Sequence, residues 1–330
     1  MSLDFGNGVD SVKIKILTTN SVDATLLTDP NMKGKVIQPM KEVIGAIAEH
    51  GLSMSIKINN KNILYDFGGL GFTVLKNLPI FQINPEIFDK CVLSHGHFDH
   101  FGSMFKLAPK LGENKEIIVS PDIYQQKIAY LATSGDQISL EELTKNFKTY
   151  KREGKAQQLP GIKKKLLDKM IEDNNLKLIE TKIPIELGPG IWTSGEIELF
   201  DKSELSSNLF LKIDKTTFKE ETFRDEIAIY IMVKDKGLIV LTGCGHTGII
   251  NIIKHGKKIS GINKIYAVIG GFHLNWSTDE HIEKVVNYFK EIKPEIICGM
   301  HCTGFNFNKK MMTEMPKNTT LGVVGTEFHL

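Results

Sequence analysis

The stretch CVLSHGHFDH (91–100) places three imidazoles and a carboxylate directly after a short apolar run. Such a run is typical of a buried strand, which delivers the side chains that follow it to the end of a sheet. His95 and His97 alternate along an extended segment and so lie on one side of it, whereas Asp99 and His100 follow at a turn. Imidazole and carboxylate groups suit borderline divalent metals such as zinc. We therefore predict that His95 and His97 share one ion and that Asp99 and His100 face a second.

Other polar side chains also follow strand-like runs. His246 comes after LIVLTGCG, His273 after YAVIGGF and His301 after IICGM. Ligand sites in open α/β sheets form at strand ends, so we expect these histidines to gather at the same site. Next to His301, Thr303 and Gly304 offer a hydroxyl and backbone amides to a phosphate oxygen, although an ordinary turn explains them equally well.

The charge balance limits the ligands that this chain can hold. The formal net charge is +2, from 41 basic and 39 acidic residues, which argues against a dedicated nucleic-acid binder. Only Arg152 and Arg224 are arginines. A bound phosphate would therefore have to be neutralised by lysines, backbone amides, helix N-termini or metal.

Cysteine content and hydropathy indicate the compartment. Four cysteines in 330 residues do not form a disulfide framework. No secretory signal is visible, and the longest apolar runs fall far short of the roughly 20 residues that a membrane helix needs. We expect a cytoplasmic protein without membrane contact, and we leave open whether it forms a homo-oligomer.

The order of elements favours one α/β domain over residues 1–330. Strand signals dominate early, with an expected hairpin formed by residues 53–59 and 62–69, and strands alternate with helices after a second hairpin at 226–246. Between about 125 and 185 the chain becomes rich in lysine and poor in apolar residues. This composition predicts an inserted helical segment, which is either a solvated face or a lid whose lysines meet an anionic substrate.

The HxHxDH pattern at 95–100 resembles the signature of the metallo-β-lactamase superfamily. The resemblance implies an αββα sandwich, of the α/β class (α+β in some schemes), with one or two metal ions at one edge of the paired sheets. Asp66 in LYDFG resembles the strand-end aspartate of that superfamily, which supports the histidine loop. Zinc is the metal we favour, with manganese, iron or magnesium as alternatives.

Five further motifs narrow the resemblance to the dihydropterin synthase-like branch of that superfamily. They are EHGLS (49–53), LSHGH (93–97), TGCGHTGI (242–249), GGFHL (270–274) and HCTG (301–304). The characterised archaeal members of the branch are 7,8-dihydropterin-6-methyl-4-(β-D-ribofuranosyl)aminobenzene-5'-phosphate synthases of methanopterin biosynthesis. The resemblance implies that His301 binds the second ion with Asp99 and His100, and that His50 faces the substrate.

The chain departs from the wider superfamily at two ligand positions. The hairpin begins at Arg224-Asp225-Glu226 without a histidine, and its second strand ends at Cys244-Gly245-His246 without an aspartate. His246 is the replacement ligand that we expect for the first ion, and Cys244 is a lesser candidate. The absent bridging carboxylate weakens the interpretation of the chain as a plain hydrolase.

Two functions follow from these motifs. The first is a transferase that joins a 6-hydroxymethyl-7,8-dihydropterin diphosphate to 4-(β-D-ribofuranosyl)aminobenzene 5'-phosphate and releases diphosphate. Its expected catalytic side chains are Asp99 and His273, with His50, Thr303 and Gly304 contacting substrate. His273 has two open roles, as a substrate or proton-transfer group and as an additional metal ligand. The alternative function is a metal-dependent hydrolase of a phosphoester, lactone or thioester.

Overall fold

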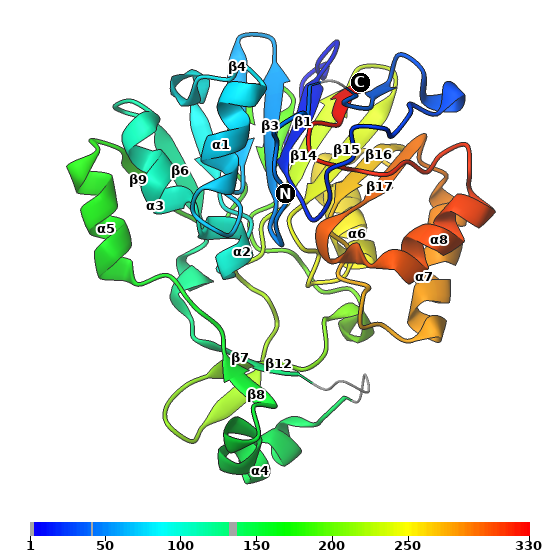
Figure 1. Ribbon diagram of the computed structural model, residues 1–330. Helices are drawn as coiled ribbons and strands as arrows, with labels where there is room; N and C mark the ends of the chain where they lie inside the picture. Colours follow the sequence, from blue (N-terminus) through cyan, green and yellow to red (C-terminus); the bar gives the residue numbers. More distant parts are fainter. Residues whose placement is uncertain (1–2, 41, 132–136) are drawn as a thin grey trace.

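Two β-sheets pack face to face, and helices cover both outer faces of the pair (Figure 1). The computed structural model describes residues 3–40, 42–131 and 137–330. The four layers confirm the αββα sandwich of the α/β class that the resemblance implies. The histidine-bearing loops lie at the lower edge of this sandwich in the view of Figure 1, as the strand-end argument predicts.

The larger sheet has eight strands in the order β2-β18-β1-β3-β4-β5-β6-β9. The first five strands of this order, β2, β18, β1, β3 and β4, pair antiparallel with their neighbours. Strands β5, β6 and β9 continue the sheet in parallel pairing. The expected first hairpin is confirmed, since β3 and β4 pair around Asn59, whose φ of 52° suits the tight turn. The strands are β1 Lys13–Thr18, β2 Val36–Ile37, β3 Ser53–Ile58, β4 Lys61–Tyr65, β5 Lys90–Val92, β6 Glu116–Val119, β9 Lys177–Glu180 and β18 Glu327–His329.

The second sheet has six strands in the order β10-β11-β14-β15-β16-β17. Its first four strands are antiparallel, including the predicted second hairpin β14–β15, and β16 and β17 join in parallel. The parallel strands end at the edge that bears the histidines. The strands are β10 Glu186–Gly188, β11 Ile191–Thr193, β14 Ile229–Val233, β15 Gly237–Thr242, β16 Ile265–Gly270 and β17 Ile296–Gly299.

Three apolar cores hold the four layers together. The central core lies between the sheets, where Ile56 of the larger sheet and Ile239 of the smaller are both fully buried. One outer core joins α1 (Thr73–Ile80), α2 (Phe98–Phe101), α3 (Met104–Leu107) and α5 (Lys164–Asp173) to the larger sheet. The other joins α6 (Ile249–Ser260), α7 (Asp279–Ile292) and α8 (Phe305–Glu314) to the smaller sheet. Within the described ranges, no helix combines the length and apolarity needed to cross a membrane.

A small subdomain projects from the edge that bears the histidines (Figure 1). It is a four-stranded sheet, in the order β13-β12-β7-β8, with α4 (Leu140–Arg152) packed on it around its own apolar core. Its strands are β7 Lys127–Tyr130, β8 Ala156–Gln158, β12 Leu209–Lys212 and β13 Phe218–Glu220.

This subdomain differs in make-up from the helical insertion expected at about 125–185. Its segment within the expected range holds two strands besides the helix, and its sheet is completed by two strands from residues 209–220. The lysine-rich residues 164–180 instead return to the main body, because α5 buries Leu167 and Met170 in the outer core and β9 pairs with β6. Amphipathic spacing of those two apolar residues within a lysine-rich helix explains why composition alone misled.

Candidate metal centre

The loops that follow β4, β5, β15, β16 and β17 bring the polar side chains together. Asp66, His273 and His301 adopt left-handed backbone conformations, with φ angles of 62°, 48° and 56°. Such conformations are costly for residues other than glycine and occur preferentially at functional sites. These three left-handed positions lie at the same edge that the histidine pattern indicates.

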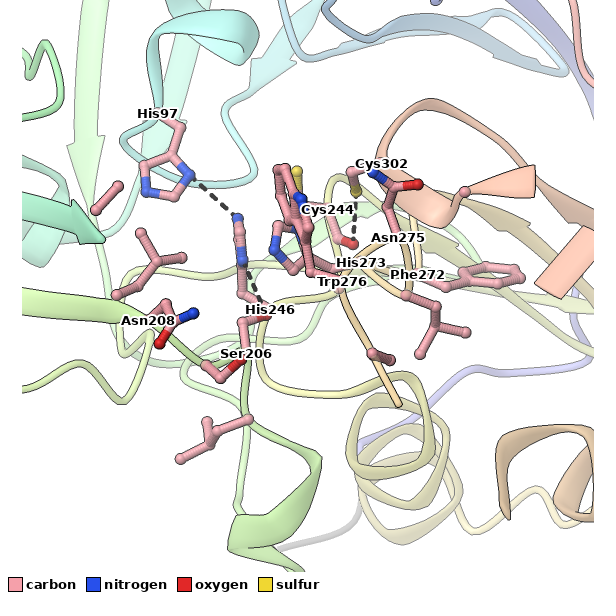
Figure 2. A pocket seen from close by; sticks show the side chains of 18 of the residues that line it. His97, Ser206, Asn208, Cys244, His246, Phe272, His273, Asn275, Trp276 and Cys302 are labelled. Atoms are coloured by element: carbon pink, nitrogen blue, oxygen red, sulfur yellow. Dashed lines mark hydrogen bonds between the residues drawn. The ribbon is translucent and has the colours of Figure 1, made fainter. Parts of the chain in front are cut away.

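His95, His97 and His246 form the first cluster. Their ring centroids lie 4.6–4.9 Å apart in all three pairs, and Nδ1 of His97 lies 3.1 Å from Nε2 of His246 (Figure 2). Burial lowers the pKa of all three side chains well below the ordinary histidine value, and neighbouring positive groups add to this. The imidazoles are therefore neutral at physiological pH, which is the form that binds metal.

Asp99, His100 and His301 form the second cluster. Nε2 of His301 lies 3.1 Å from Oδ2 of Asp99 and 3.2 Å from Nε2 of His100. Nδ1 of His301 in turn contacts Oδ1 of Asn20 at 3.0 Å, which fixes the ring with Nε2 toward the cluster. The structure thus brings together both sets of residues that the sequence assigns to the two ions.

Cys244 lies between the two clusters. Its Sγ is 3.1 Å from Nε2 of His100. Together with Asp99, His100 and His301 it forms a group of donor atoms within 4.8 Å of one another, and it forms a second such group with His95 and His246. A thiolate here would reach both ions, which gives Cys244 a more central place than the lesser role expected for it.

Asp66 supports the second cluster by contacting the ring nitrogen of His100 that faces away from it. Its Oδ2 contacts Nδ1 of His100 at 2.6 Å, and its Oδ1 accepts a hydrogen bond from the backbone N–H of Ser94 at 2.7 Å. Burial opposes a charge on His100, but the carboxylates of Asp66 and Asp99 prevail and raise its pKa to about 9. This contact turns Nε2 of His100 toward the cluster, as in the carboxylate–histidine pairs that orient metal ligands.

The donor atoms fit a divalent metal. Nε2 of His95 and Nε2 of His97 are buried without a hydrogen-bond partner among the described residues. Buried polar atoms without hydrogen-bond partners are rare in folded proteins. Here both nitrogen atoms belong to histidines of the first cluster. Imidazole, carboxylate and thiol donors in this number suit zinc or iron, and either ion would satisfy the orphaned nitrogens.

Comparisons with known proteins agree with this geometry. The 7,8-dihydropterin-6-methyl-4-(β-D-ribofuranosyl)-aminobenzene-5'-phosphate synthase of Methanocaldococcus jannaschii is 33% identical over 278 residues, which cover 82% of this chain and 86% of that protein. The chain belongs to the dihydropterin synthase-like branch of the metallo-β-lactamase superfamily. An uncharacterized protein of the same organism is 31% identical over 280 residues, which cover 84% of this chain and 92% of that protein.

The fold comparison extends to a solved structure. The crystal structure of Tm1679, a metal-dependent hydrolase of the β-lactamase superfamily, has a TM-score of 0.70 at 22% identity, covering 97% of this chain and 99% of that chain. At this identity the likeness shows the fold alone. No protein-family model matches the chain.

In this member of the branch, Glu226 anchors the loop that carries His246. Its buried carboxylate accepts hydrogen bonds from the backbone N–H groups of Gly245, His246 and Thr247 at 2.7–2.8 Å and from the Thr247 hydroxyl at 2.6 Å. Burial raises the pKa of Glu226, whereas the hydrogen bonds from Thr247 and His246 act in the opposite direction. The segment before β14 lacks the histidine of the wider superfamily, and its Glu226 holds the loop of His246 in place.

A second buried carboxylate links the small subdomain to the histidine loop. Asp225 accepts a hydrogen bond from the backbone N–H of Gly96 at 2.9 Å and pairs with Lys127 of β7, whose Nζ lies 2.8 Å from both carboxylate oxygens. Glu221 lies 3.5 Å from the same ammonium group. Although burial opposes its charge, Asp225 and Glu221 raise the pKa of Lys127. None of these support residues was singled out from the sequence.

A pocket of about 1440 Å³ opens onto the centre and runs toward the small subdomain. His50, Gly304 and His273 line it, as expected for substrate-facing residues, and Trp276 and Phe98 add exposed aromatic rings. Figure 2 shows His273 and Trp276 in this lining. Its described lining contains no lysine or arginine. Of the groups expected to neutralise a bound phosphate, lysines are absent from this described lining, which leaves metal, backbone amides and helix N-termini.

Two residues show the limits of the sequence-based assignment. Thr303 was expected to contact substrate, but its buried hydroxyl donates to the Met300 carbonyl and accepts from the Phe272 amide, so the structure gives it a loop-holding role. Asn20 was not anticipated, although its side chain contacts both His301 and His50. No local pattern around Asn20 signals this contact across 281 residues of sequence separation.

Proposed function

We propose that this protein is a metal-dependent transferase that joins 6-hydroxymethyl-7,8-dihydropterin diphosphate to 4-(β-D-ribofuranosyl)aminobenzene 5'-phosphate with release of diphosphate. The observation that favours it most is the synthase relative, which this chain matches over 86% of its length. The site supports the same reaction through its donor set, its size and its distribution of charge.

The size of the pocket supports a reaction between two substrates. Sites for one drug-sized ligand usually enclose about 300–1000 Å³. The pocket here reaches about 1440 Å³, and its lining includes residues of both histidine clusters. Trp276 and Phe98 are 56% and 41% exposed and offer flat faces on which a pterin or a benzene ring can stack.

The charge distribution of the pocket supports metal-assisted departure of diphosphate. With no lysine or arginine in the described lining, a bound divalent metal would supply the Lewis acid that neutralises the leaving group. The backbone amides at two helix N-termini add to this, because Gly248 and Gly304 are the N-cap residues of α6 and α8 and both line the pocket.

His50 is the side chain that we assign to proton transfer. The arylamine nitrogen forms a bond to the methylene carbon, the carbon–oxygen bond to diphosphate breaks, and the arylamine proton passes to the imidazole. Nε2 of His50 lies 3.4 Å from Asp99, and its Nδ1 lies 3.3 Å from Nδ2 of Asn20. His50 lines the pocket but belongs to none of the three donor groups, so a metal held by those groups would not occupy its ring nitrogens.

A coupling assay tests the proposal. Purified, metal-loaded protein is incubated with the two substrates, with and without a chelator, and the coupled pterin and diphosphate are followed by chromatography and mass spectrometry. We expect equal amounts of the two products and their loss with chelator. Absence of coupling alongside turnover of a simple phosphodiester would identify a hydrolase and overturn the transferase assignment.

Two histidine variants give the assay a matched comparison. His97→Ala removes a ligand of the first cluster and should abolish both metal content and coupling. His329→Ala removes a histidine on β18 whose ring contacts Glu327 and lies outside the pocket lining. It should leave both unchanged, and retention of metal by the His97 variant would contradict the proposed ligand set.

A further inference from the structure

A third group of donors lies on the pocket side of the centre. Sγ of Cys244, a ring nitrogen of His273 and Sγ of Cys302 all lie within 4.8 Å of one another. Figure 2 shows the three side chains converging from separate loops, with the Cys302 thiol 3.2 Å from the Cys244 carbonyl oxygen. Cys244 and Cys302 are 2% and 7% exposed, so both thiols are buried beside the pocket wall.

The backbone around this group leaves room for the sulfur of Cys302. A Cβ atom on Gly271 would lie 2.8 Å from that sulfur and 2.4 Å from the Gly243 carbonyl oxygen, so only glycine permits this approach. Two residues later, His273 holds its left-handed conformation, and its Nδ1 is buried without a hydrogen-bond partner among the described residues. A glycine, a strained histidine and an orphaned nitrogen thus occur together in the GGFHL segment.

The chemistry of these donors differs from that of the two histidine clusters. Imidazole and carboxylate ligands accept a broad range of divalent metals, including manganese. Thiolates are soft ligands that favour zinc and iron over magnesium and manganese. Because Cys244 belongs to all three donor groups, an ion bound to its sulfur is also within reach of Cys302 and His273.

We propose that Cys302 and His273 act with Cys244 as a third donor group of the metal centre, and that the paired sulfurs make the centre select Zn²⁺ or Fe²⁺ over Mg²⁺ and Mn²⁺. This inference rests on the metal centre of the proposed function. It assigns His273 to metal binding, the second of its two open roles, and leaves proton transfer to His50.

Cobalt(II) substitution tests the number of sulfur ligands. Sulfur-to-cobalt charge transfer gives a near-ultraviolet absorption band whose intensity follows the number of bound thiolates. We expect the band in wild-type protein, about half its intensity in Cys302→Ala because one of two soft ligands is lost, and none in the Cys244/Cys302 double variant. His273→Ala should keep the band but shift its position and weaken cobalt binding about 10- to 100-fold, as for other perturbed ligand shells.

Cys91→Ala is the matched control, since Cys91 is a buried thiol of the outer core and belongs to no donor group. Its band should equal that of wild type. Cys302→Ser, which keeps the side-chain volume, guards against misfolding of the alanine variant, and its band should also fall to about half.

Four outcomes decide the proposal. An unchanged band in both Cys302 variants would overturn it, and so would cobalt binding by wild-type protein without any sulfur band. Complete failure of wild-type protein to bind cobalt would refute the metal centre itself, and with it the proposed function. Zinc-over-manganese preference measured by competition should fall at least tenfold in Cys302→Ser, and an unchanged preference would overturn the selectivity part.

Discussion

Replacement of Glu226 by glutamine tests whether the loop anchor sets both stability and metal affinity. The carboxylate accepts four hydrogen bonds, two on each oxygen, and three of the donors are backbone N–H groups. The glutamine amide retains only one oxygen. Whichever way it turns, its NH₂ group faces at least one backbone N–H, which then loses its acceptor.

The size of the effect follows from the hydrogen bonds lost. A buried donor left without an acceptor costs about 1–3 kcal/mol, and replacing charged by neutral acceptors weakens the retained bonds by roughly 1 kcal/mol each. Removing the buried charge offsets part of this, since burial raises the pKa of Glu226. We expect Glu226→Gln to lower the free energy of unfolding by about 2 kcal/mol and to weaken metal binding 10- to 100-fold through His246.

Urea unfolding of the chelator-treated protein measures the first effect, and titration with zinc measures the second. Glu220→Gln, at an exposed position on β13, is the matched control and should change neither quantity. If Glu226→Gln unfolds at the wild-type urea concentration and binds zinc as tightly as wild type, the loop anchor has no influence on the centre and the reasoning fails.

Three further changes test other parts of the site. Asp66→Asn should weaken zinc binding 10- to 100-fold, because it removes the carboxylate that orients His100; equal affinity by titration would contradict that role. Lys127→Met leaves Asp225 and Glu221 buried without their cation and should cost about 3–5 kcal/mol in urea unfolding, whereas Lys155→Met at an exposed site should cost little. The unfolding free energy of chelator-treated protein should peak near pH ~6.5, the unfolded histidine pKa. Below it, stability is lost because the histidines of the unfolded chain take up protons, whereas His95, His97 and His246 of the folded protein have lowered pKa values and stay neutral. Above it, stability is lost up to the His100 pKa of about 9, and a flat profile from pH 5.5 to 9 would refute both statements.

The parts predictable from sequence are those set by local patterns. Alternation and turn residues located the two hairpins, β3–β4 and β14–β15, and apolar runs placed His95, His246 and His301 at strand ends. The resemblance supplied the pairing of these strands into a sandwich, which periodicity alone does not give. Both sets of predicted ligands then gathered as expected, because strand ends at one edge have few other places to lie.

The parts that escaped prediction depend on contacts between distant segments. The small sheet pairs β7 with β12, more than 70 residues apart, and no local signal specifies that partner. Lysine density placed α5 in an exposed insertion, although two buried residues per helix suffice to hold it against the main sheet. The support roles of Asp225 and Glu226 likewise depend on loops meeting across the sheet edge.

The central position of Cys244 follows from the way the two sheets meet. His95, His97, Asp99 and His100 come from the loop after β5 of the larger sheet, whereas Cys244, His246 and His301 follow strands of the smaller sheet. Cys244 follows β15, a central strand of the smaller sheet, and its side chain reaches across to the loop of the larger sheet. Its Sγ lies 3.1 Å from Nε2 of His100. A bound ion there would tie one sheet to the other, so the metal centre and the closure of the sandwich at this edge depend on the same few contacts.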